Sequence, residues 1–124
     1  MKTIRLALLL AACASLGACD SWPTSLDNRA PEDVTFRYHH RLYDQWSVWA
    51  PVSHDRAVLL AREHRMRDIS GLEITQGGLT YRYAENALAP VHRFCAGSAS
   101  CSLVYRGGGR LEARTKPLTD SQFQ

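Results

Sequence analysis

A pair of glycines at positions 77 and 78 separates two short segments that are rich in strand-forming residues. Segment 71–76 (GLEITQ) precedes the glycines, and segment 79–83 (LTYRY) follows them. Two-residue loops of this composition join the strands of β-hairpins, because glycine adopts positive φ without steric cost. The pair therefore predicts a hairpin and, with it, antiparallel β-structure in the second half of the chain.

Further strand signals lie on both sides of this hairpin. Residues 34–38 alternate apolar and polar side chains, which is typical of a half-buried strand. Segments 91–94 and 102–105 predict another strand pair. The glycines at 107–109 then turn the chain into a last strand at 110–114.

One segment carries helix signals. Ser53 is a favourable N-cap, Asp55 suits the first turn, and Arg65 and Arg67 suit the last turn. The apolar residues between them form a buried side of helical width. The expected fold class is α+β, with one helix at 53–67 packed on a small antiparallel sheet of about four to six strands.

The 124 residues are enough for one domain, which we place at 34–116. Residues 19–33 hold two prolines and several Ser, Asp and Asn residues, so they are expected to form an irregular, flexible tether. The polar tail at 117–124 is expected to fray.

The first 18 residues have the layout of a secretory signal peptide. Lys2 and Arg5 form a charged start, residues 6–12 are an unbroken apolar run, and small residues follow. The apolar run is too short to cross a bilayer core, which takes about 20 residues. The segment is therefore expected to direct export and then to be removed.

The end of this segment, Leu16-Gly17-Ala18-Cys19, resembles the lipobox of bacterial lipoprotein precursors. The resemblance implies that Cys19 is lipidated and becomes the new N-terminus on the periplasmic side. Leu10-Ala11-Ala12-Cys13 also matches the box and is the alternative site. Asp20 resembles an inner-membrane retention signal, which favours the inner membrane, with the outer membrane as the alternative.

The net charge of the mature chain limits the classes of partner that it can bind. Of 15 basic residues, Lys2 and Arg5 lie in the signal, so the mature chain carries 13 basic and 12 acidic residues, a net charge of +1. Nucleic-acid binding needs a dense basic face, so a nucleic-acid partner is not expected.

Two cysteines, Cys95 and Cys101, remain if Cys19 is lipidated. An even pair in an exported protein predicts a disulfide, and the small residues between the two cysteines suit a tight hairpin tip. A redox-active pair is the alternative, but the Cys-x-x-Cys spacing is missing.

Residues for metal or nucleophilic chemistry have no recognisable spacing. His39 and His40 are adjacent and would face opposite sides of a strand, while His54 and His64 would lie nearly three helical turns apart. No zinc-ligand spacing and no Gly-x-Ser-x-Gly motif is present. We therefore expect no metal, no cofactor and no catalytic residue.

Two features point to binding. Trp46 and Trp49 lie in an aromatic stretch, for which core packing is the default expectation and a binding surface the alternative. Arg106, Arg110 and Arg114 flank the triple glycine, where they form either a solvated sheet face or a site for carboxylates or phosphates.

The function expected from these features is non-enzymatic. The protein would be a membrane-anchored periplasmic lipoprotein that binds a protein partner, as an accessory of an envelope or secretion assembly or as an inhibitor or immunity protein. Binding of an anionic glycan or lipid headgroup through the arginines is the alternative. A small cell-wall hydrolase is the third hypothesis.

Overall fold

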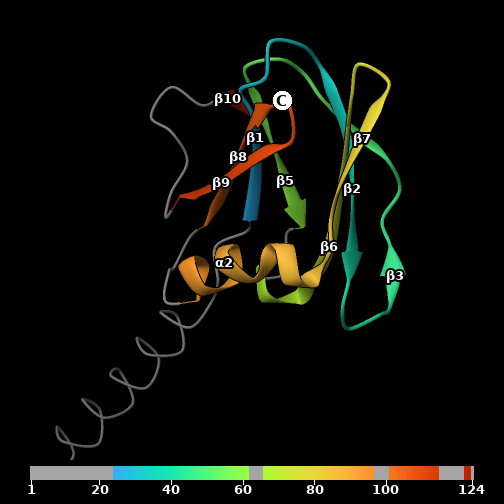
Figure 1. Ribbon diagram of the computed structural model, residues 1–124, viewed down its shortest axis with the longest axis vertical. Coiled ribbons are helices and arrows are strands. Elements are labelled where there is room, and N and C mark those ends of the chain that lie inside the picture. The colour runs from blue at the N-terminus through green and yellow to red at the C-terminus, as the bar shows by residue number, and fades with distance from the viewer. Residues whose placement is uncertain (1–23, 62–65, 97–100, 115–121, 124) are drawn as a thin grey trace, which may run out of the picture.

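Ten strands in two sheets, one α-helix and one 3-10 turn make up the part of the chain that the computed structural model describes, residues 24–61, 66–96, 101–114 and 122–123 (Figure 1). The first sheet has the order β10-β5-β1-β8-β9. The second has the order β3-β2-β6-β7, and β4 also pairs with β2.

The strands of the first sheet are β1 (Thr24–Asn28), β5 (Arg56–Ala61), β8 (Ser102–Gly107), β9 (Arg110–Arg114) and β10 (Gln122–Phe123). The strands of the second sheet are β2 (Val34–His40), β3 (Gln45–Trp46), β4 (Ala50–Val52), β6 (Ile69–Gln76) and β7 (Leu79–Tyr83). The 3-10 turn η1 spans Met66–Asp68, and the helix α2 spans Glu85–Cys95.

The core lies between the two sheets, and α2 closes one end of it (Figure 1). Leu26 and Leu103 enter the core from the first sheet, Phe36 and Leu72 enter it from the second, and Leu88 enters it from α2. The α+β class is therefore confirmed. The strands are divided between two sheets, and two of the strand pairs, β1–β8 and β10–β5, are parallel.

Both glycine turns form as predicted. Gly77 and Gly78 have φ values of 55° and 80° and connect the antiparallel strands β6 and β7. Residues 107–109 also have positive φ and connect β8 to β9. The strand predicted at 34–38 is part of β2.

The predicted helix at 53–67 is wrong. Residues 56–61 form β5, which pairs with β1, and a turn at Asp55 (φ 57°) precedes it. Met66 is buried in η1, and residues 62–65 lie outside the described residues. The backbone of β5 forms its hydrogen bonds with the central strand β1. This pairing outweighs the local helix signals, which are a weak guide by themselves.

The helix forms instead at α2, which contains the segment 91–94 that we predicted as a strand. Leu88, Val91 and Cys95 are its buried residues, and their spacing of three and four residues is helical. Pro90 lies inside the helix, where proline is ordinarily unfavourable. Burial of this apolar stripe over the end of the core outweighs that cost.

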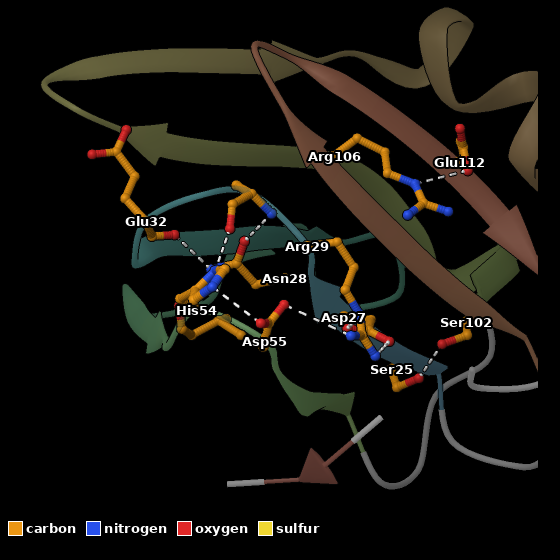
Figure 2. Close-up of polar contacts among 12 residues, drawn as sticks. Ser25, Asp27, Asn28, Arg29, Glu32, His54, Asp55, Ser102, Arg106 and Glu112 are labelled. Carbon is orange, nitrogen blue, oxygen red and sulfur yellow. Dashed lines mark hydrogen bonds and ion pairs between the residues drawn. The ribbon is translucent and has the colours of Figure 1, made fainter. Parts of the chain in front are cut away.

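The expected tether at 19–33 is also wrong from Thr24 onward, because β1 is fully buried. Its polar residues have partners: Ser25 and Ser102 share a 2.6 Å hydrogen bond, and Arg29 donates to Asp27 at 2.9 Å (Figure 2). The Asn28 amide donates to the carbonyl of Val52 at 3.0 Å. A polar strand can be buried when each polar group is hydrogen-bonded, which composition does not reveal.

The Cys95–Cys101 disulfide is present. It joins the end of α2 to the residue before β8, so the expected hairpin tip is wrong. In the tail, residues 122–123 form β10 on β5 rather than fraying.

Residues 1–23, which include Cys13, Cys19 and Asp20, lie outside the described residues. Within the described part, no helix has the length and apolarity needed to cross a membrane.

Candidate binding face

Two rows of side chains cross the outer face of the second sheet, the face turned away from the core. In one row, His39 of β2 lies between Trp46 of β3 and Gly71 of β6. In the next row, Glu73 of β6 lies between Arg37 of β2 and Arg82 of β7. Opposed residues of neighbouring strands share a face, so strand register brings these side chains together.

Glu73 is a buried carboxylate between two cations. It is 5% exposed, and its oxygens lie 3.0 Å from Arg37 Nη2 and 3.6 Å from Arg82 Nε. Placing a carboxylate at this depth is costly unless cations and hydrogen bonds compensate it, and the two arginines supply both. Arg37, the nearer cation, also contacts the aromatic residues of the site.

The guanidinium of Arg37 stacks against both tryptophans. It lies 4.6 Å from the ring centroid of Trp46 and 5.0 Å from that of Trp49. Both rings remain on the surface, 42% and 43% exposed, so the core-packing expectation for them is wrong. The cation gives each ring a favourable partner outside the core, which is why burial is not required.

The tryptophans belong to a run of exposed apolar side chains, residues 42–49, which we call the aromatic loop. Its exposed large apolar residues are Leu42, Tyr43, Trp46, Val48 and Trp49. Val48 is 85% exposed. Five large exposed apolar side chains within eight residues are unusual on a surface that faces only water.

A pocket of about 450 Å³ opens beside the aromatic loop. Trp46 and His39 line one side, Ser70 and Gly71 line another, and Glu85 at the start of α2 contributes to the rim. A Cβ atom at Gly71 would lie 3.1 Å from Trp46 Cη2 and 3.3 Å from His39 Cβ. The missing side chain at Gly71 is therefore what lets the indole and imidazole lie close to the sheet.

A chain of polar contacts runs along the pocket through His39. Its Nδ1 lies 2.5 Å from Ser70 Oγ, and its Nε2 lies 3.1 Å from Asp44 Oδ1. Asp44 is 93% exposed at its side chain. Because 31 positions separate His39 from Ser70, no spacing along the chain predicts this contact, and the sequence pointed only to a metal-ligand role for His39, which it disfavoured.

The three predicted hairpin arginines lie on the first sheet and are not grouped with the tryptophans. Arg106 Nε contacts Glu112 Oε2 at 3.3 Å across β8 and β9 (Figure 2). Arg110 is exposed, and its Nε reaches the Gly107 carbonyl at 3.5 Å. Arg114 is half-buried at the end of β9.

The turn between β8 and β9 is held to the second sheet by Tyr83 of β7, whose hydroxyl donates to the Gly109 carbonyl at 2.6 Å. Burial, with smaller contributions from Tyr105 and Tyr81, raises the pKa of Tyr83 well above its ordinary value. The phenol therefore stays protonated as a donor at neutral pH. Among the described residues, no cluster of three or more His, Cys, Asp and Glu residues could hold a metal ion.

Comparison with known proteins gives no assignment. No family model, curated protein or solved structure matches this chain. What the protein binds must therefore be inferred from its own side chains.

Proposed function

We propose that the protein is a lipid-anchored protein of the bacterial envelope that binds a protein partner through the aromatic loop. The lipobox resemblance at Leu16-Gly17-Ala18-Cys19 supports the anchor. The Cys95–Cys101 disulfide is in keeping with an oxidising compartment such as the periplasm. The aromatic loop supports the mode of action.

The exposed tryptophans held by Arg37 are the observation that carries this proposal. Trp, Tyr and Arg are the residues most enriched among those that dominate binding energy at protein interfaces. Stacking on Arg37 fixes both rings before a partner arrives, which reduces the entropy lost on binding. Leu42 and Val48 add apolar area that is exposed in the free protein.

The short connection to the anchor restricts where the partner lies. Five residue steps separate Cys19 from Thr24, the first residue of β1. They span at most about 18 Å when fully extended. We therefore propose a partner in the membrane or close to its periplasmic surface, with the inner membrane favoured by Asp20.

The hairpin arginines have a smaller part in this proposal. Arg106 is already neutralised by Glu112, which leaves Arg110 as the more available cation. We expect Arg110→Ala to weaken partner binding less than Trp49→Ala does, since an exposed charge contributes little to affinity.

Site-directed photo-crosslinking in cells tests the proposal. A photoreactive phenylalanine analogue replaces Val48, and a control carries it at Leu79, another exposed apolar position, at the start of β7. We expect one defined protein adduct from position 48, its loss on Trp49→Ala, and no adduct from position 79. Mass spectrometry of the N-terminal peptide, with Cys19→Ser as control, tests the anchor. Equal adducts at both positions, or none at 48, would refute the binding face.

A hydrolase is the second candidate, favoured by the Ser70–His39–Asp44 contacts beside the pocket. It ranks second because Asp44 is exposed to water, where a carboxylate stabilises an imidazolium weakly. A serine-directed fluorophosphonate probe tests it. Labelling of the wild type that is lost in Ser70→Ala would establish a nucleophile, whereas an unlabelled wild type excludes this candidate.

A further inference from the structure

We infer that the pocket beside Trp46 binds an uncharged sugar unit. This site lies next to the proposed protein-binding surface and shares Trp46 with it. Three observations carry the inference: the charge balance of the pocket, the kind of polar groups that line it, and its aromatic wall.

The formal charges of the ion-paired groups at the pocket sum to zero, because three carboxylates (Glu73, Glu85 and Asp44) stand against three guanidiniums (Arg37, Arg82 and Arg41). Glu73 is paired with Arg37 and Arg82, and Glu85 is paired with Arg41. The carboxylate of Asp44 contacts His39 Nε2 at 3.1 Å. A ligand with a net charge would upset this overall balance, which is costly where the groups are shielded from water. The electrostatics therefore favour a ligand without net charge.

The lining groups are nevertheless rich in hydrogen-bonding capacity. A carboxylate accepts several hydrogen bonds and a guanidinium donates five, so groups engaged in ion pairs still have capacity for hydroxyls. Ser70 adds a hydroxyl that both donates and accepts. The Arg82 side chain is 77% exposed and reaches the pocket with most of its donors available. A ligand that matches this set carries several neutral hydroxyl or amide groups.

The aromatic wall selects a ring with an apolar face. Arg37 stacks on the ring of Trp46, a residue that lines the pocket and is 42% exposed overall. A pyranose presents C–H groups on one face and hydroxyls at its edge, which matches an indole wall with polar groups around it. The volume of about 450 Å³ lies in the usual range of ligand sites, and it accommodates one or two sugar rings.

Binding of two neutral disaccharides, N,N′-diacetylchitobiose and maltose, tests the inference by saturation-transfer NMR on the full domain. At least one is expected to bind with a Kd of about 1 mM. Arg82→Met is expected to weaken binding about fivefold, as loss of one hydrogen bond does. Arg93→Met, an exposed arginine on α2 away from the pocket, is the matched control and leaves binding unchanged.

Gly71→Val is the steric test, because its side chain enters the space between Trp46 and His39. Binding is expected to be lost while near-ultraviolet circular dichroism stays that of a folded protein. If this variant does not fold, Ser70→Ala with Arg82→Met decides the question.

Three results would overturn the inference. The first is the absence of saturation transfer from both disaccharides, and the second is equal binding by Arg82→Met and Arg93→Met. The third is preferential, salt-sensitive binding of glucuronic acid, which would show that the site takes an anion. Crosslinking from position 48 in the Ser70→Ala variant separates this test from that of the partner-binding proposal, because each can fail alone.

Discussion

Removing the positive charge of Arg37 should destabilise the protein and loosen the binding face together. The side chain contacts Glu73, Trp46 and Trp49 from the middle of the second sheet. Arg37→Met keeps an apolar stem that packs on the rings and removes only the guanidinium. The variant therefore isolates the electrostatic part of the cluster.

The cost can be worked out from these contacts. Two exposed cation–π contacts contribute about 0.5–1 kcal/mol each. The 3.0 Å hydrogen bond to the Glu73 carboxylate contributes about 1.5–3 kcal/mol, because the acceptor is charged and buried. Arg37→Met should therefore lower the free energy of unfolding by about 2.5–5 kcal/mol, a large part of the stability of a small domain.

A double-mutant cycle with Glu73→Gln separates the two contributions. In the Glu73→Gln variant, Arg37→Met removes mainly the cation–π contacts and should lower the free energy of unfolding by about 1–2 kcal/mol. Urea unfolding followed by tryptophan fluorescence should then give a coupling energy of about 2 kcal/mol between the two positions. Costs that simply add, to within about 0.5 kcal/mol, would show that Arg37 does not compensate the buried carboxylate.

Three further predictions concern the scaffold. The free energy of unfolding should be about 2.4 kcal/mol lower in the variant Cys95→Ala/Cys101→Ala than in the wild type, because the unfolded chain regains the loop entropy of the ring from 95 to 101. In urea unfolding, a reductant should destabilise the wild type but not this variant. Gly109→Ala should be more destabilising than Gly108→Ala, since both have positive φ but only the Cβ at 109 meets a tyrosine ring, at 2.7 Å; equal melting temperatures would contradict the packing of the turn. Because the pKa of Tyr83 is raised in the folded state, its contribution to stability is complete below about pH 10 and is lost as pH rises beyond that; urea midpoints at about pH 8 and about pH 11 should fall less in Tyr83→Phe than in the wild type.

The sequence predicted what depends on local backbone chemistry. The glycines at 77–78 and 107–109 determine two turns, and the strands on either side follow from them. The disulfide was predicted from an even cysteine pair in a chain expected to be exported. In these cases the residues that carry the signal lie within a few positions of the structure that they specify.

Features that depend on distant partners were missed. The composition of the polar strand β1 is that of a linker. Its Ser25 is hydrogen-bonded to Ser102, which is 77 residues away in the sequence and is brought close only in the folded sheet. The predicted helix at 53–67 failed for the same reason, since β5 is stabilised by its pairing with β1. Local propensity is a weak guide where such contacts decide the structure.

The binding face was half predicted. The sequence drew attention to Trp46 and Trp49, but their exposure depends on Arg37, which strand pairing places beside Glu73. Arg82 joins this row because the β6–β7 hairpin sets its register opposite Glu73. A row that crosses three strands has no spacing that can be recognised along the chain.

The position of β1 determines how the domain responds to mechanical load. In a chain anchored through Cys19, a pull from the membrane reaches the fold at Thr24, the start of a strand held between β5 and β8. A pull along the axis of such a strand loads it in shear, so its hydrogen bonds on both sides must break together instead of opening one by one. Ser25 also donates a backbone hydrogen bond to Cys101, whose disulfide to Cys95 passes the load on to α2. If Cys19 carries the proposed anchor, load therefore enters the fold at a strand that is hydrogen-bonded on both sides.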